Sequence, residues 1–294
     1  TIVEEETIVE EETIVEEETI VEEETIIEED NSSIDNEEVK IDGSNFWEGI
    51  DPDRLKIYFK NIDSINSSTL YNEFVKLLTD FNLDINNSKN NEILFLIIKK
   101  LVDLGEIQKA YNLVKSIQLP NDKNLIFYKT LELNFLFSTY QLNEACELKN
   151  DFNLQELKLP NNYLEKSDIF CLVMEEKLDE ANLLNSILVE TEVNNDQYFQ
   201  DLLNIILNPK NDIEKVSLKL TKDYFEDLIF LYSAMLRIAE LPLTEKFLQI
   251  DPNNLSIPII LSNATDLELR LKAANKAYLN NLISIESLAA LYQS

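Results

Sequence analysis

The chain has 294 residues, of which 56 are acidic and 25 are basic, so its formal net charge is −31 at pH 7. This charge disfavours DNA, RNA and anionic membrane surfaces as partners, because the phosphate-driven part of such binding would be repulsive. The sequence has no histidine and only three isolated glycines, which excludes histidine-dependent catalysis, histidine-ligated zinc and a phosphate-cradling glycine loop. We therefore expect no catalytic residue, no cofactor, no metal and no enzymatic activity.

Residues 1–30 are built from one acidic hexapeptide, Thr-Ile-Val-Glu-Glu-Glu, which occurs four times and is followed by the variant Thr25–Asp30. Six residues of α-helix turn through about 600°, so successive Ile-Val pairs spiral around the helix instead of forming one apolar face. On a β-strand each face would carry glutamate beside the aliphatic residues. We therefore expect residues 1–45 to be a disordered, acidic low-complexity arm and linker. Because the chain begins inside a repeat unit, we also expect the natural N-terminus to lie upstream.

From Phe46 onward the sequence predicts one α-helical repeat domain, residues 46–294, in which loops rich in Asn and Asp separate amphipathic helices. Apolar residues at helical spacing mark the second helix, namely Leu70, Phe74, Leu77, Leu78 and Phe81. Residues 67–69 (Ser-Ser-Thr) are candidate N-caps for it. Phe46 and Trp47 have two interpretations: they could form an aromatic docking motif for a partner, or they could anchor the first helix over the end of the core, which we favour.

Three stretches in the middle of the chain echo one another, and each ends in alanine: Gly105–Ala110, Tyr140–Ala145 and Glu176–Ala181. The alanines are 35 and 36 residues apart, a period that is typical of stacked helical hairpins. A small side chain lets two helices approach to about 8 Å. We therefore expect Gly105 and the three alanines to be positions of close helix packing.

The stretch that begins at Gly105 resembles the second helix of a tetratricopeptide repeat, which carries a Gly at the hairpin turn, an Ala in the following helix and a Pro after it. Gly105 and Ala110 match this pattern, and Pro120 arrives slightly early. In the other two stretches, Tyr140 and Glu176 stand in place of the Gly. The resemblance implies an all-α fold, a right-handed α-solenoid of stacked helical hairpins.

Such a solenoid has a concave surface lined by the first helix of each hairpin, which takes an extended peptide or a partner helix. If the hairpins are aligned on their alanines, the residues of the first helices that line this surface would be Lys99, Thr130, Asn134 and Lys166. The two lysines would suit an acidic or carboxylate-bearing segment of the partner. We therefore expect a non-enzymatic scaffold that binds a partner protein or peptide.

The two cysteines, Cys146 and Cys171, lie in apolar surroundings. We favour two buried free thiols over a disulfide, and so few cysteines are compatible with the cytoplasm as well as the periplasm.

The alternative function is a structural or assembly subunit, or a spacer, of a larger complex such as one of the cell envelope. Leu288, Leu291 and Tyr292 near the C-terminus are then expected to be covered by self-association through the solenoid ends. No apolar run reaches the roughly 20 residues that span a bilayer, so we expect no direct membrane insertion of this chain.

Overall fold

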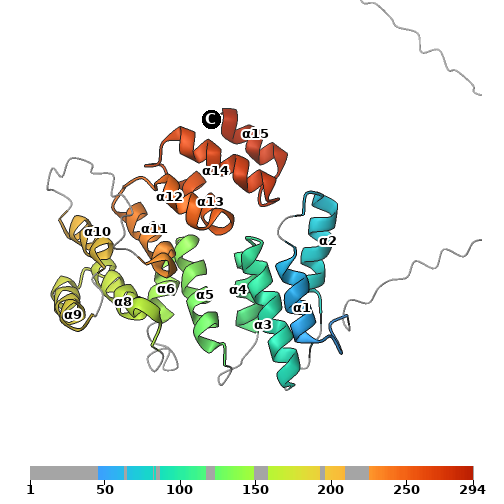
Figure 1. Ribbon diagram of the computed structural model, residues 1–294. Helices are drawn as coiled ribbons and strands as arrows, with labels where there is room; N and C mark the ends of the chain where they lie inside the picture. The colour runs from blue at the N-terminus through green and yellow to red at the C-terminus, as the bar shows by residue number, and fades with distance from the viewer. Residues whose placement is uncertain are drawn as a thin grey trace, which may run out of the picture. The chain divides into compact units, whose positions relative to one another are not determined.

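The computed structural model describes residues 46–62, 65–81, 83, 87–116, 123–148, 158–192, 196–208 and 225–293, and within these ranges the chain forms helices and no strand (Figure 1). The prediction of an all-α fold is therefore confirmed. The arm and linker, residues 1–45, lie outside the described residues.

In chain order the helices are α1 (Pro52–Lys60), α2 (Ser68–Thr79), α3 (Ser88–Asp103), α4 (Ile107–Ser116), α5 (Leu125–Ser138), α6 (Leu142–Glu147), the 3-10 helix η3 (Pro160–Asn162), α8 (Tyr163–Met174), α9 (Leu178–Thr191), α10 (Gln197–Leu207), the 3-10 helix η4 (Glu226–Leu228), α11 (Ile229–Ile238), α12 (Glu245–Ile250), α13 (Pro252–Leu261), α14 (Leu267–Leu279) and α15 (Ile285–Gln293).

Short polar side chains start several of these helices by accepting hydrogen bonds from amides that would otherwise lack a partner. Ser67 Oγ accepts from the Leu70 amide at 3.4 Å, which confirms the predicted N-cap of α2. Asn87 Oδ1 accepts from the Lys89 amide at the start of α3, at 3.0 Å. Ser and Asn residues of the loops thus fix where α2 and α3 begin.

The three echoing stretches are helix-to-helix turns with one geometry. In each turn the first residue has a left-handed backbone, with φ of 85° at Gly105, 62° at Tyr140 and 60° at Glu176. The Gly105 amide donates to Val102 O at 3.0 Å and the next amide, of Glu106, donates to Leu101 O at 2.9 Å. This pair of bonds is the Schellman motif that ends an α-helix, and the turns at 140 and 176 repeat it.

Two more turns of this kind occur later in the chain, at Glu240 (φ 52°) and Asn281 (φ 59°). Their sequences do not resemble the first three, because the position filled by alanine in those stretches is occupied by Glu245 and Glu286. The sequence pattern therefore detected three of the five Schellman turns among the described residues.

The three alanines are all buried, as the close-packing prediction requires. Each is the fourth residue of its helix, in α4, α6 and α9, where it lies against the first helix of the hairpin. Consecutive hairpins then contact each other, α4 with α5 and α6 with α8. From α3 to α9, neighbouring hairpins thus contact each other in chain order.

After α9 the chain folds back on earlier helices. Helix α11 packs against α5, and α13 also contacts α5 (Figure 1). The side-chain amides of Asn253 and Asn254 donate to Asp103 O (2.6 Å) and Val102 O (3.1 Å) at the end of α3. In a purely serial repeat array each unit touches only its neighbours, so these contacts between segments some 150 residues apart are a departure from that pattern.

Helix α5 lies where the two parts of the hydrophobic core meet. Its residues Tyr128 and Leu131 belong to the core formed with α1–α4, whereas Leu133, Phe135 and Leu136 belong to the core formed with the later helices. A helix that is buried on opposite sides must be apolar nearly all round. This explains why α5 has no clear polar face.

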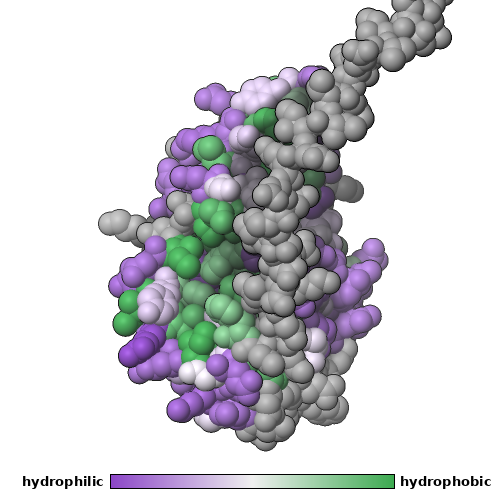
Figure 2. Space-filling model, turned by 90° about the vertical axis from the view of Figure 1, so that its right-hand side faces the viewer, coloured by the Kyte–Doolittle hydropathy of each residue, from purple (hydrophilic) through white to green (hydrophobic). Residues whose placement is uncertain are grey.

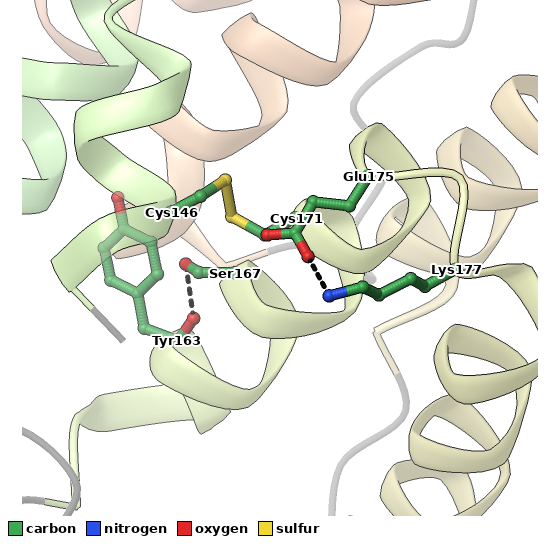
Figure 3. Close-up of a disulfide and its surroundings, with 6 residues drawn as sticks. All are labelled: Cys146, Tyr163, Ser167, Cys171, Glu175 and Lys177. Carbon is green, nitrogen blue, oxygen red and sulfur yellow. Dashed lines mark hydrogen bonds and ion pairs between the residues drawn. A yellow bond between two sulfur atoms is a disulfide. The ribbon is translucent and has the colours of Figure 1, made fainter. Parts of the chain in front are cut away.

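The two cysteines form a disulfide, which corrects the expectation of free thiols (Figure 3). Cys146 in α6 and Cys171 in α8 are both buried, with Cα atoms 5.5 Å apart. The two residues are 25 positions apart in sequence, and the spacing alone could not show that successive hairpins bring them together. The bond links the α5–α6 hairpin to the α8–α9 hairpin.

Replacing Ala110 by Leu is expected to lower the free energy of unfolding by about 1–3 kcal/mol, because the larger side chain overpacks the contact between α3 and α4. The matched control is Ala290→Leu on the exposed side of α15, where we expect a change within about 0.5 kcal/mol. Urea denaturation measures both. Equal stabilities of the two variants would contradict the close-packing role of Ala110.

Removing the glycine of one turn and introducing a glycine at an equivalent turn are expected to change the stability of the protein in opposite directions. Gly105→Ala should destabilise, because the new Cβ would lie 2.8 Å from Leu282 Cδ2 in a left-handed backbone. Glu176→Gly should stabilise by up to about 1 kcal/mol, because Glu176 is exposed and holds the same backbone at a cost. The measurement is the midpoint of urea denaturation, and shifts of the same sign would contradict the shared geometry.

Candidate binding surface

The four residues predicted to line a concave surface do not share one exposed face. Lys99 is exposed on α3. Thr130 is half-buried, and its hydroxyl donates to Ile126 O of its own helix at 2.9 Å. Asn134 Oδ1 accepts from the Tyr163 hydroxyl at 2.9 Å. Lys166 is fully buried, at 0% exposure, so the prediction that its ammonium is available to a partner is wrong.

Lys166 lies inside α8 on the face that packs into the core. Its Nζ donates to Glu192 Oε1 at 2.7 Å, to Asp196 Oδ2 at 2.8 Å and to Asn161 O at 3.0 Å. The ring of Phe225 completes the surroundings, with its centroid 4.9 Å from Nζ, a distance at which the ring face attracts a cation. The ammonium therefore has a set of anionic and carbonyl acceptors inside the protein.

Asp196, which is fully buried, connects this lysine to α10 and α11. Its Oδ1 accepts from the Phe199 amide at 3.0 Å as the N-cap of α10, and its Oδ2 also accepts from the Tyr232 hydroxyl at 2.8 Å. Burial, together with the negative charge of Asp196, raises the pKa of Tyr232 far above its ordinary value, so Tyr232 stays protonated and can donate. We call Asn161, Lys166, Glu192, Asp196 and Tyr232 the Lys166 cluster.

A signal for the burial of Lys166 exists in the sequence. Tyr163 and Phe170 stand three residues before and four residues after it, so all three side chains share one helix face. Both aromatic residues are fully buried. When the repeats were aligned on their alanines, Lys166 was assigned to the concave surface. The apolar residues of α8 recur at a spacing that instead assigns Lys166 to the core.

Trp47 anchors the start of the described domain, as the favoured interpretation predicts. Its side chain is only 2% exposed, and Nε1 donates to Leu77 O at 3.1 Å. The buried Lys100 holds α1 in the same region, because its Nζ donates to Phe59 O at 3.0 Å at the helix C-terminus, where a cation is favoured. Phe46, in contrast, is exposed and packs edge-on against Trp47.

An apolar groove of about 460 Å³ opens between Phe46, α1 and α2. Its walls are mostly aromatic and aliphatic, with Asp51 and Arg54 as the charged members; they include Phe46, Trp47, Leu55, Tyr58, Phe59, Phe74 and Leu77. Figure 2 faces the side of the domain on which α1 and α2 lie in Figure 1, and hydrophobic side chains gather on it. Ile57, Tyr58 and Leu70 on these helices are each at least 60% exposed.

A second, smaller groove of about 180 Å³ lies between α8 and α9. Its apolar lining comes from Ile169, Leu184, Ile187 and Leu188, and its polar lining includes Glu165 and Asp168. The two grooves differ in chemistry: the one on α1–α2 is aromatic, and the one on α8–α9 combines apolar and acidic side chains.

Comparisons with protein-family models, with curated proteins and with solved structures find no match to this chain. The resemblance to tetratricopeptide repeats therefore stays a prediction. None of the helices in the described ranges combines the length and the apolar character needed to cross a membrane. Within those same ranges, Cys, Asp and Glu side chains form no group of three or more that could hold a metal ion.

Replacing Lys166 by Met is expected to lower the free energy of unfolding by about 3–5 kcal/mol, because Glu192 and Asp196 would lose the cation that they share inside the protein. The matched control is Lys99→Met, on an exposed position, where a change within about 0.5 kcal/mol is expected. Thermal and urea denaturation monitored by circular dichroism measure both variants. If the stability of Lys166→Met equals that of the wild type, the ammonium is not buried among these carboxylates.

Proposed function

We propose that the chain is a non-enzymatic scaffold that binds a partner protein, and that its α1–α2 groove holds a short apolar segment of that partner. The observation that carries this proposal is the aromatic lining of the groove. Its volume of about 460 Å³ lies within the range of roughly 300–1,000 Å³ that is typical of ligand sites. Exposed aromatic side chains are the residues most often found at the centre of protein interfaces.

The extent of the apolar surface favours a protein segment over a small molecule. Ile57 and Leu70 are exposed on the same two helices but do not line the groove. A partner segment that continues past the groove would cover them as well. Asp51 and Arg54 at the groove can pair with polar groups of that segment and fix its direction.

The hairpins α3–α4, α5–α6 and α8–α9 support the architectural part of the proposal, a tetratricopeptide-like right-handed α-solenoid. They share one turn geometry and one buried alanine position. Arrays of this kind function mainly as binding surfaces. The lack of histidine in the whole sequence supports a role without catalysis.

The alternative, an assembly subunit, is favoured by one observation at the C-terminal helices. Leu279, Ile285 and Tyr292 are each more than half exposed on α14 and α15. Leu288 is already buried within the chain, so the expectation that a second copy covers it is wrong. A second copy that covers the three exposed side chains would make the chain a dimer or a larger assembly. Light scattering over a concentration series distinguishes this function from the scaffold.

The scaffold proposal is tested with a library of random peptides displayed on phage and selected on the full chain. We expect enrichment of peptides with clustered apolar residues. Their affinity, measured by fluorescence anisotropy, should fall about tenfold or more in Tyr58→Asp, which removes an exposed wall of the groove. The matched control, Tyr278→Asp on α14, should bind as the wild type does. Enriched peptides that bind wild type and Tyr58→Asp equally would contradict the proposal.

A further inference from the structure

Helix α9 exposes several large apolar side chains to solvent. Of its 14 residues only Ala181 and Leu188 are buried. Leu183, Leu184 and Ile187 are 63%, 38% and 48% exposed, and their spacing of one, three and four positions places them on one flank of the helix. These three side chains form an apolar seam on α9 that remains partly exposed.

The seam borders the acidic groove between α8 and α9. Leu184 and Ile187 belong to both, since they also line the groove with Ile169 of α8. A side chain inserted there from outside would contact apolar atoms below and the carboxylates of Glu165 and Asp168 at the side. The seam and the groove together form what we call the α9 surface.

The charge of the α9 surface is negative throughout. Helices α8 and α9 contain one basic residue, Lys166, and its charge is buried and paired in the Lys166 cluster. The turn between the helices adds Lys177, whose Nζ pairs with Glu175 at 2.7 Å (Figure 3). The remaining charged side chains of the two helices are all carboxylates, namely Glu165, Asp168, Asp179, Glu180 and Glu190.

We propose that the α9 surface binds an amphipathic α-helix of a partner protein that carries Lys or Arg beside its apolar stripe. Leucine and isoleucine at positions 183, 184 and 187 offer the spacing into which the knobs of a partner helix fit. Basic side chains on either side of that stripe would meet Glu165 and Glu180 across the interface. The surface belongs to other helices than the α1–α2 groove, so this inference goes beyond the proposed function.

The chemistry argues against the other occupants of an apolar face. Nucleic acid and anionic lipid would be repelled by the carboxylates. A second copy of this chain carries a net charge of −31 itself, so its approach to an acidic surface is also unfavourable. A basic helix is the partner whose charge and apolar pattern both complement the α9 surface.

The surface is held in place before any partner arrives. The Lys166 cluster fixes α8 and the end of α9, and the Cys146–Cys171 disulfide ties α8 to α6. Asn185 of α9 and Gln200 of α10 exchange two side-chain hydrogen bonds of 2.9 Å. A surface that is ordered in advance loses less entropy on binding.

The inference is tested with three synthetic fluorescent peptides of about 18 residues, roughly five helical turns. The first is an amphipathic Leu/Lys helix, the second has the same pattern with Glu in place of Lys, and the third scrambles the Leu/Lys composition so that no apolar stripe forms. Binding to the full chain is measured by fluorescence anisotropy. We expect the amphipathic Leu/Lys helix to bind at least about tenfold more tightly than the other two.

The site is tested with the double variant Leu183→Ser/Ile187→Ser, and Leu261→Ser/Leu267→Ser on α13 and α14 is the matched control. All four side chains are exposed, so both variants should keep the melting temperature of the wild type. We expect the α9 variant to lose about tenfold in affinity for the Leu/Lys helix and the control to lose none. The same comparison cancels non-specific attraction to the acidic residues 1–42, which both variants retain.

Three outcomes would overturn the inference. Equal binding of the Leu/Glu helix would show that positive charge on the partner does not matter. Equal binding of the scrambled peptide would show that an apolar stripe on the partner is not needed. Unchanged affinity of the Leu183→Ser/Ile187→Ser variant would place the peptide elsewhere on the chain. None of these outcomes depends on the peptide-library result at the α1–α2 groove, so the two proposals fail separately.

Discussion

A fully buried ammonium group constrains this domain more than any other single feature. Removing an amine and two carboxylates from water costs several kcal/mol for each ion, and this cost is offset only where every charge has its partners in place. Lys166 therefore requires Asn161, Glu192 and Asp196 to meet around it, although they come from different segments of the chain. These bonds hold α8 and the C-terminal end of α9 against the start of α10 and against α11.

The turn at Gly105 makes possible the contacts between the end of α3 and the α13–α14 hairpin. Because this residue has no side chain, Leu282 and Asn253 can approach its backbone, where a Cβ would clash. Asn253 and Asn254 then satisfy two carbonyl groups at the end of α3, as orphan carbonyls at helix ends require. The turn that ends one hairpin is thus also a docking point for a hairpin far along the chain.

The sequence was sufficient to predict the all-α fold, the N-cap of α2 and the burial of the three alanines, because each depends on neighbours within one helix or one hairpin. The disulfide, the contact between α11 and α5 and the Lys166 cluster were not predicted, since they depend on which hairpins meet. The Schellman turns at Glu240 and Asn281 were missed because Glu245 and Glu286 stand where the other three stretches carry alanine. The candidate surface was misplaced for a related reason: the repeat register assigned Lys166 to the outside, whereas its aromatic neighbours on α8 carry it into the core.

The most direct test of this account is the reactivity of individual lysines toward an acylating reagent, read by mass spectrometry on the native chain. The account predicts that Lys166 stays unmodified in the folded protein and reacts after denaturation, whereas the exposed Lys99 and Lys177 react in both states. Modification of native Lys166 at the rate of Lys99 would show that its ammonium reaches solvent. The buried cluster, and the rigid α9 surface that depends on it, would then be contradicted.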